Sequence, residues 1–214
     1  MSDSAVPAGQ LTELTVGDAS TSWERAGFVV VDDTVRLGDV TVRLVEPDGG
    51  RGIRSWSLHG IDGQIDGLWS RPPGPVPANG TEHPNGVTTV DHLVVETDDF
   101  ARTVPAFETV GLELRRTRTF DFGDGERQQC FFWMGSVILE LIGRAAPAAD
   151  AAPPARFWGL ALISPDLDAT AAHLGDVTSA PKDAVQKGRR ISTLRTRDLD
   201  ISVPVAFMSP HVAG

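Results

Sequence analysis

Three segments of the chain repeat one succession of sequence patterns, and this repeat limits the possible folds more than any other feature. In the clearest copy, an apolar strand at residues 92–96 runs into Asp98 and Asp99, either of which can cap a following helix. Gly111 can end that helix, because glycine readily adopts the left-handed conformation common after helices. Three more strand-like segments follow, at residues 112–119, 127–134 and 137–142. This copy therefore reads strand, helix, strand, strand, strand.

The helix of the central copy is expected to span about residues 100–110. Pro105 falls inside it and should bend or shorten it, because proline lacks a backbone N–H donor. A turn is expected at residues 121–125, where Gly123 and Gly125 accept positive φ angles at little cost. The last two strands should therefore be preceded by a hairpin connection.

The C-terminal and N-terminal thirds carry related copies of this pattern. In the C-terminal copy a helix is expected from Asp166 to Leu174, ended by Gly175, with strands at residues 157–163, 190–197 and 201–208. The N-terminal copy is compressed, with a helix at residues 20–26 and strands at residues 11–16, 28–31, 34–37 and 40–45. A repeat of about 60 residues indicates that one supersecondary unit is reused, and that each unit buries its core against another.

Segments rich in proline or alanine separate the copies. The run from Arg71 to Pro77 holds four prolines and cannot maintain regular structure, so residues 71–86 are predicted to be a linker. Residues 145–154 form a second linker. The predicted organisation is a partial unit at residues 1–70 and a domain at residues 87–214, whose two modules span residues 87–144 and 155–210.

Charge and composition exclude several classes of partner. The net charge of −10 disfavours binding to nucleic acid and to anionic membranes. No apolar run approaches the length of a membrane span, and residues 1–10 lack the features of a signal peptide. Cys130 is the single cysteine, so no internal disulfide can form, and its apolar neighbours indicate a core residue. A reducing, cytoplasmic location is therefore expected.

One histidine and one glutamate stand out within apolar strands of the central copy. His92 lies near the start of one strand, and Glu140 lies between Leu139 and Leu141 in another. A charge in a core is costly unless it is paired or binds a metal. If the two strands are neighbours, His92 and Glu140 should face the same cavity and approach closely enough to share a ligand, a water molecule or an arginine. A metal site and a metal-free hydrogen-bonded pair both fit this pattern.

The central and C-terminal copies resemble the paired βαβββ modules of the glyoxalase/bleomycin-resistance/extradiol-dioxygenase superfamily, also called the vicinal oxygen chelate superfamily. The resemblance rests on the histidine strand followed by Asp98-Asp99-Phe100, on the strand around Glu140, and on the run from Asp166 to Thr170. It implies an α+β fold in which repeated βαβββ modules form a curved-sheet cleft, here with an extra N-terminal partial module. It also implies a homodimer, because members often pair modules between chains.

Members of this superfamily hold a divalent metal through residues on the first and last strands of each module. His92 and Glu140 match two of these ligands, whereas Gly159 and Ala206 stand where the second histidine and glutamate are expected. Catalytic zinc and facial-triad iron sites each need three protein ligands. A divalent metal such as Zn, Ni, Mn or Fe would thus need a third ligand here. His83 and Gln129 are candidates, although His83 could instead anchor its loop.

Two more residues are expected in the ligand site. Arg189 and Arg190 enter a strand, where successive side chains point to opposite faces, so only one can point inward. Arg190 is predicted to bind an anionic ligand oxygen or to neutralise Glu140, and the alternative is that both arginines are exposed. Trp158 is predicted to contact the ligand as well, because the aromatic pairs around it can offer one face to an apolar pocket.

Two classes of function follow from these residues. In the first, the protein binds a small oxygen-bearing molecule in the cleft between modules, as bleomycin-resistance members do, with a degenerate metal site. In the second, it is a metal-dependent isomerase, lyase or dioxygenase that uses His92, Glu140 and a third ligand. The N-terminal unit could also serve assembly, with little chemistry anywhere in the chain.

Overall fold

The chain forms two compact units, each assembled from separate stretches of sequence. The computed structural model describes residues 7–76, 82–121, 123, 125–145 and 152–211. The first unit contains Met1–Glu13, Ser55–Gly74 and His92–Trp158, and the second contains Leu14–Arg54, Pro75–Asp91 and Gly159–Gly214. Each unit therefore combines part of residues 1–70 with most of one predicted βαβββ module.

Strands dominate both units. The helices are α1 (Ser20–Arg25), α2 (Phe100–Thr109) and α3 (Leu167–Leu174), with short 3-10 helices η1 (Pro47–Gly49), η2 (Gly175–Val177) and η3 (Thr196–Leu199). The strands are β1 (Leu11–Val16), β2 (Thr34–Leu37), β3 (Val40–Leu44), β4 (Ile53–Leu58), β5 (Gly63–Ile65), β6 (Leu68–Ser70), β7 (Thr89–Glu96), β8 (Leu114–Asp121), β9 (Glu126–Met134), β10 (Val137–Arg144), β11 (Arg156–Ile163), β12 (Lys182–Asp183), β13 (Arg190–Thr193) and β14 (Val205–Met208). Among the described helices, none combines the length and apolar character that a membrane span requires.

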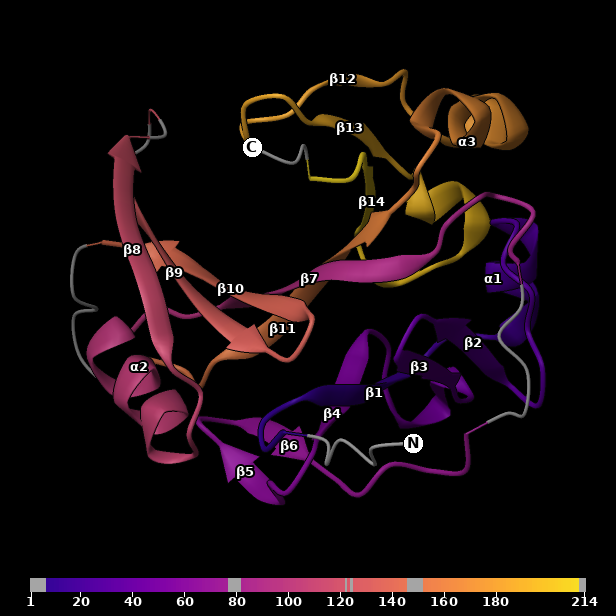
Figure 1. Cartoon of the computed structure of the whole chain (residues 1–214). Coiled ribbons are helices and arrows are strands. Elements are labelled where there is room, and N and C mark those ends of the chain that lie inside the picture. Colours follow the sequence, from indigo (N-terminus) through magenta and orange to yellow (C-terminus); the bar gives the residue numbers. More distant parts are fainter. Residues whose placement is uncertain (1–6, 77–81, 122, 124, 146–151, 212–214) are drawn as a thin grey trace, which may run out of the picture. The chain divides into compact units, whose positions relative to one another are not determined.

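The first unit contains the central βαβββ module. Its strands follow the order β7-β10-β9-β8, with β10 parallel to β7 and antiparallel to β9. β8 in turn pairs antiparallel with β9. The first strand of the module thus lies beside its last strand, and α2 packs against one face of the sheet (Figure 1). A smaller sheet in the same unit has the order β4-β6-β5.

Side-chain alternation divides the β7-β10-β9-β8 sheet into a core face and an opposite face. The core face carries Leu93, Leu139 and Phe132, all essentially inaccessible to solvent. Phe107 of α2 packs edge to face on Phe132, with ring centroids 5.3 Å apart, and Trp56 of β4 packs on Phe107 at 6.1 Å. Helix α2 is therefore held by aromatic burial on the core face of the sheet.

The boundaries of α2 agree with the sequence expectation. Asp99 is the N-cap, and its side chain accepts a hydrogen bond from the backbone N–H of Arg102 at 3.0 Å. Pro105 lies inside the helix, which continues to Thr109. The predicted helix is thus confirmed, and proline shortens it by no more than a residue at its C-terminal end.

One aspartate joins the β5-β6 hairpin to α2 in the first unit. Asp66 and Gly67 make a two-residue connection with φ angles of +43° and +90°, as Asp-Gly hairpin turns require. The Asp66 carboxylate accepts hydrogen bonds from Nε of Arg102 at 2.7 Å and from the hydroxyl of Thr103 at 2.5 Å. The side chain of Asp66 is only 5% exposed. This contact fixes the turn against the first part of the helix.

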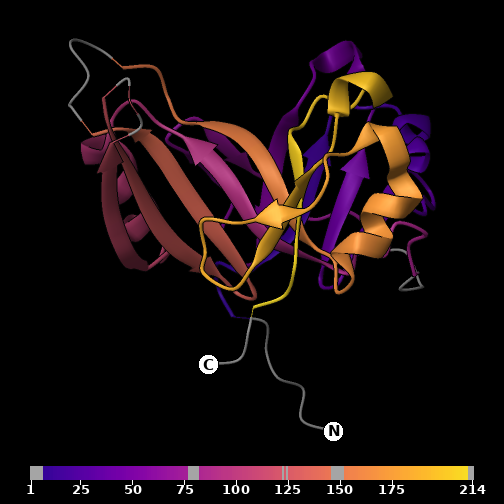
Figure 2. The ribbon, with the colours of Figure 1, turned by 90° about the horizontal axis from the view of Figure 1, so that it is seen from above.

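The second unit contains the C-terminal module, and its sheet has the corresponding order β12-β13-β14-β11. β14 runs parallel to β11, with Leu160 opposite Val205. The Asp166 carboxylate caps α3 by accepting from the backbone N–H of Ala169 at 3.0 Å. Helix α3 lies beside β13 (Figures 1 and 2). The remaining sheet of this unit has the order β2-β3-β1.

The predicted fold class, α+β with repeated βαβββ modules, is confirmed, and the differences concern individual strands. Residues 28–31 were expected to be a strand but contribute only the isolated bridge between Val31 and Thr34. The expected strands at residues 190–197 and 201–208 are reduced to β13 and β14, because η3 and an extended segment lie between them. The predicted turn at residues 121–125 lies partly outside the described residues, but the backbone N–H of Gly123 donates to the Asp121 side chain.

Candidate functional site

His92 and Glu140 lie on the same face of the β7-β10-β9-β8 sheet in the first unit. Ile138 stands opposite His92 and Glu140 opposite Val94, so His92 and Glu140 are diagonal neighbours. Nε2 of His92 lies 3.4 Å from Oε2 of Glu140, and their side chains are 15% and 16% exposed. The structure therefore brings together the two residues that the sequence singled out. Their role in binding a metal or ligand stays a prediction.

A glutamine and an arginine extend this pair across the sheet. Nε2 of Gln129, on β9, donates to Oε1 of Glu140 at 2.5 Å, and Nε of Arg118, on β8, donates to Oε1 of Gln129. The Arg118 guanidinium lies over the ring of Phe120, 5.2 Å from its centroid. We call His92, Glu140, Gln129 and Arg118 the polar chain. It places the Glu140 carboxylate between two hydrogen-bonding side chains on the face that does not form the core.

A cavity of about 230 Å³ lies beside the polar chain in the first unit. It is lined by Glu96, Phe120, Arg127, Gln128, Gln129, Ile142 and Gly143. Gln129 belongs both to this lining and to the polar chain. The volume is just below the range of roughly 300–1,000 Å³ typical of ligand pockets, so the cavity suits a small molecule. Apolar and polar groups both line it, which allows it to orient such a molecule.

Three tryptophans of the first unit, Trp69, Trp133 and Trp158, are about half exposed. Trp158, predicted to contact the ligand, lies at the start of β11 and is 47% exposed. Its role in binding stays a prediction. Trp133 stands opposite Ile138, which stands opposite His92, so Trp133 shares the face of the polar chain and is 48% exposed. Phe132, the residue before Trp133 on β9, is buried on the opposite, core face.

Arg189 and Arg190 take different environments in the second unit, as alternation predicts. Arg189 is the buried one and forms a bidentate ion pair with Asp91, at 2.8 and 3.2 Å. Arg190 is 43% exposed and pairs with Asp168 at 2.6 and 3.0 Å. The Arg190 guanidinium lowers the pKa of Asp168 through this hydrogen bond. The inward arginine is thus Arg189, not Arg190, and a role for Arg190 in ligand binding stays a prediction.

The residues present do not fit a three-ligand metal centre. His92 and Glu140 offer two ligands, and the carbonyl oxygen of Gln129 accepts from Arg118. Within the described parts of the chain, no group of three or more His, Cys, Asp or Glu is placed to hold a metal ion. A Cβ atom at Gly159 would lie 2.8 Å from the carbonyl oxygen of Pro204, so a histidine there would require a main-chain shift.

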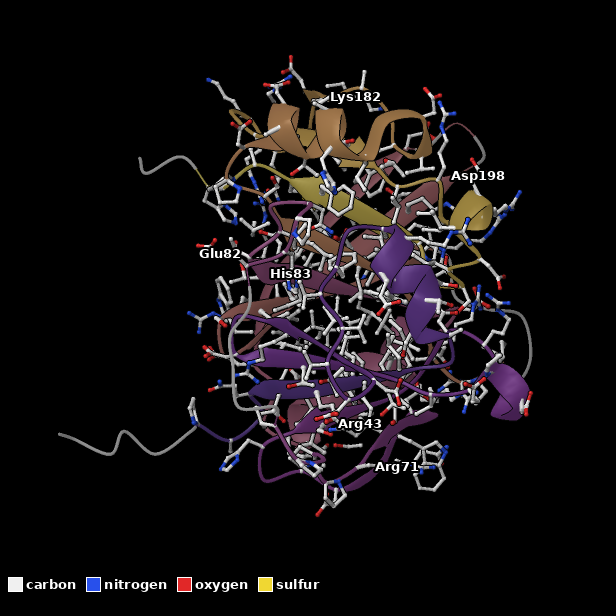
Figure 3. All side chains as sticks on the ribbon, turned by 90° about the vertical axis from the view of Figure 1, so that its right-hand side faces the viewer. Arg43, Arg71, Glu82, His83, Lys182 and Asp198 are labelled. Carbon is white, nitrogen blue, oxygen red and sulfur yellow. The ribbon has the colours of Figure 1, made fainter. Side chains whose placement is uncertain are left out.

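His83 anchors its loop within the second unit. The backbone N–H of Val29 donates to Nδ1 of His83 at 3.1 Å, and Nε2 lies 2.8 Å from the carbonyl oxygen of Arg36. Burial lowers the pKa of His83, which favours the neutral ring that these two contacts need. His83 is buried while the neighbouring Glu82 is exposed (Figure 3). Both ring nitrogens are therefore occupied by the backbone, as the anchoring interpretation of the sequence requires.

Comparison with known proteins establishes the fold. No protein-family model matches the sequence, and no curated protein matches it. A fusion of a xylose isomerase-like TIM barrel with 4-hydroxyphenylpyruvate dioxygenase is similar over 98% of this chain and 50% of its own, with a TM-score of 0.62 and 12% identity. An extradiol ring-cleaving dioxygenase from B. fuscum matches over 99% and 75%, with a TM-score of 0.55 and 11% identity. BphC, a halotolerant catechol dioxygenase, matches over 97% and 87%, with a TM-score of 0.54 and 10% identity.

The chain therefore shares its fold with these dioxygenase structures, in agreement with the fold that the resemblance in the sequence implied. Identities of 10–12% establish the architecture and leave the activity open. What the site does must accordingly be argued from its own residues.

Several residues of the site were not singled out from the sequence. Arg118 and Arg127 lie in strands where polar residues alternate with apolar ones, a pattern typical of a solvent-facing side. Gln129 was considered only as a metal ligand, and it donates to Glu140 instead. The alternation Arg127, Gln129, Phe131 carried the signal that these side chains share one face.

Proposed function

We propose that this protein binds a small oxygen-bearing molecule on the β7-β10-β9-β8 face of its first unit, in the cavity beside the polar chain. The observation that carries the proposal is the placement of Glu140, which is mostly buried and held between His92 and Gln129. Withdrawing a carboxylate from water is costly. Its presence outside the core, next to a cavity, favours a role in binding.

The chemistry of the lining supports an oxygen-bearing ligand. A carboxylate offers about four acceptor positions, so Glu140 can accept from a ligand hydroxyl in addition to its neighbours in the chain. Gln129 and Arg127 bring donor groups to the cavity wall, and both suit a carbonyl or carboxylate oxygen. Ile142 and Phe120 provide apolar contact for the carbon skeleton.

Replacing Glu140 by glutamine is expected to weaken the binding of catechol by about tenfold or more, since a hydrogen bond to a charged group contributes roughly 1.5–3 kcal/mol. Catechol is chosen because its two hydroxyl groups can donate to the carboxylate. Glutamine keeps the shape of the side chain and removes its charge. The measurement is a titration followed by tryptophan fluorescence, with Trp133 on the same face as a reporter.

The matched control is Glu113→Gln, which removes the same charge from an exposed glutamate of the first unit. This control should bind catechol as the unmodified protein does. Equal affinity of the Glu140→Gln variant and the unmodified protein would contradict the proposal.

The second candidate function is a metal-dependent isomerase, lyase or dioxygenase of the same superfamily. It is favoured by the His92–Glu140 pair, in which imidazole and carboxylate lie 3.4 Å apart, and by the dioxygenases among the similar structures. Metal analysis of protein purified without added metal separates the two candidates. One equivalent of Zn, Ni, Mn or Fe that survives dialysis would favour the enzyme. A substoichiometric amount would favour the binding protein, because a site with two protein ligands exchanges its metal readily.

A cytoplasmic location and a homodimer stay predictions of the sequence. The first rests on the single cysteine, Cys130, and the second on the resemblance to the superfamily. Neither is needed for the proposed binding site, whose residues all belong to the first unit.

A further inference from the structure

We infer that Arg118 is a positioning residue of the proposed site, which acts through Gln129 to present a hydrogen-bond donor to the cavity beside the acceptor offered by Glu140. The matching ligand carries an acceptor oxygen directly next to a donor group. The inference rests on the proposed function and adds to it the hydrogen-bonding pattern of the ligand. It is carried by the order in which these three side chains meet across β8, β9 and β10.

The register of the three strands brings these side chains into contact. Arg118 on β8 stands directly opposite Gln129 on β9. Gln129 in turn stands opposite Ile142 of β10, two positions from Glu140, so Gln129 and Glu140 are diagonal neighbours on the same face. Gln129 therefore lies between a guanidinium and a carboxylate and contacts both.

The chemistry of these two neighbours determines the orientation of the Gln129 amide. A guanidinium has donors and no acceptor, whereas an ionised carboxylate has acceptors and no donor. The carbonyl oxygen of Gln129 must therefore face Arg118 and its NH2 group must face Glu140, as the two hydrogen bonds have it. The reverse orientation would place two donors together at Arg118 and two acceptors together at Glu140. Both neighbours thus favour the same orientation of the amide.

Arg118 is itself held by a second contact. Its guanidinium lies over the ring of Phe120, two positions further along β8, with 5.2 Å between Cζ and the ring centroid. The side chain is partly buried, and its Nε donates to Gln129. A side chain that packs through its guanidinium and donates through Nε has little freedom, so it can hold the Gln129 carbonyl in one direction.

Fixing the carbonyl determines what Gln129 can offer to a ligand. Its amide nitrogen has two N–H groups, and one of them donates to Oε1 of Glu140 at 2.5 Å. No described residue accepts from the second N–H, and Gln129 lines the cavity. The Glu140 carboxylate next to it offers acceptors. A complementary molecule has an acceptor oxygen and a donor N–H or O–H on neighbouring atoms, as a lactam does.

The test uses 2-pyridone, a flat lactam with adjacent N–H and C=O groups, whose affinity is measured by isothermal titration calorimetry. N-methyl-2-pyridone lacks the N–H donor and should bind the unmodified protein about tenfold more weakly. Gln129→Met removes the amide and is expected to weaken the binding of 2-pyridone by about tenfold. Arg118→Met keeps the amide but releases its carbonyl, and is expected to weaken this binding by about fivefold.

A double variant distinguishes positioning from a direct contact. If Arg118 acts through Gln129, adding Arg118→Met to Gln129→Met should cause no further loss of affinity, whereas independent contributions would add. Arg118→Lys should retain most of the affinity, because lysine can also donate to the Gln129 carbonyl. The matched control is Arg115→Met, which removes an exposed arginine of the same strand that pairs with Glu113 and should bind as the unmodified protein does.

The outcomes separate the inference from the proposed function. The inference alone is wrong if Arg118→Met binds 2-pyridone unchanged, if the losses in the double variant add, or if N-methyl-2-pyridone binds as tightly as 2-pyridone. It is also wrong, with the proposed function intact, if catechol binds and 2-pyridone does not. If neither molecule binds, both are wrong. Circular dichroism verifies that each variant remains folded.

Discussion

Replacing Arg189 by methionine is expected to lower the free energy of unfolding by about 3–5 kcal/mol, because it leaves the buried Asp91 carboxylate without its counter-ion. In the second unit the two side chains are 2% and 3% exposed and meet in a bidentate pair at 2.8 and 3.2 Å. Arg189 also donates to the carbonyl oxygen of Ser209 at 2.8 Å and to the side chain of Gln186 at 2.6 Å. Methionine replaces the apolar stem of the arginine and has no N–H group to donate any of these bonds.

The neighbouring residue supplies a matched control for this prediction. Arg190→Met breaks a pair with Asp168 that has the same chemistry but is largely exposed, at 43% and 68%. Exposed ion pairs contribute little, since water screens them, so the change in stability should be much smaller. Urea-induced unfolding followed by circular dichroism measures both variants. Similar losses for Arg189→Met and Arg190→Met would contradict the importance of burial.

A double variant refines the interpretation of the Arg189 result. Asp91→Leu combined with Arg189→Met removes both charges, and buried ion pairs replaced by apolar residues are often as stable as the original pair. The double variant should therefore recover much of the stability that Arg189→Met alone loses. A loss in the double variant as large as the sum of the two single losses would mean that the two residues are not energetically coupled, and would contradict the orphaned charge as the cause of the loss.

Replacing Asp66 by alanine is expected to destabilise the first unit by about 2–4 kcal/mol, because it removes charge-assisted hydrogen bonds that hold the β5-β6 hairpin on α2. Asp66 accepts from Arg102 at 2.7 Å and from Thr103 at 2.5 Å, and it is 5% exposed. Alanine also tolerates the left-handed backbone at this position less well than aspartate does, with φ at +43°.

The variant Asp32→Ala measures the cost of a left-handed backbone at alanine without the loss of the hydrogen bonds to α2. Asp32 has a φ angle of +48° and lies on an exposed turn, so its replacement should cost about 1 kcal/mol, mainly through backbone strain. Asp66→Asn completes the series, since asparagine keeps the backbone preference and loses the charge. Chemical denaturation of the three variants gives the comparison. If Asp66→Ala is no more destabilising than Asp32→Ala, the contact with α2 does not contribute.

Local sequence signals predicted the elements that local chemistry determines. Asp98 or Asp99 marked the start of α2 and Asp166 the start of α3, because a carboxylate before an apolar periodic segment satisfies free N–H groups, and the structure has Asp99 and Asp166 as the N-caps. The succession of elements along the central module (strand, helix, strand, strand, strand) was predicted from its apolar segments and turns. β5 and β6 were missed because each spans three residues, too few to show alternation.

Long-range pairing could not be predicted in the same way. The two compact units mix stretches from distant parts of the chain, such as Leu14–Arg54 with Gly159–Gly214 in the second unit. Which segments pack together in one unit depends on which apolar faces contact each other. The sequence of a single segment does not contain that information. The strand expected at residues 190–197 ends at Thr193 in the structure, because the 3-10 helix η3 begins at Thr196.

In the candidate site, too, some residues could be predicted from the sequence and others depend on how the strands pair. His92 and Glu140 were visible in the sequence because a charge inside an apolar strand is conspicuous. Gln129 and Arg118 were not, because their place in the polar chain depends on the register of β8, β9 and β10. The sequence likewise limited the inward arginine to Arg189 or Arg190, and only the packing around Asp91 distinguishes them.

The most direct test of the binding site is a titration of isoleucine-labelled protein with catechol, followed by the NMR signals of the δ1 methyl groups. Ile138 and Ile142 lie on the face of the polar chain, and Ile142 lines the cavity, whereas Ile191 and Ile201 belong to the second unit. The substitution Ile142→Val assigns the key signal. We expect saturable shifts that are largest for Ile142, with Ile138 next and the second-unit isoleucines unchanged. Absence of any saturable shift, or largest shifts at Ile191 or Ile201, would contradict a binding site on this face.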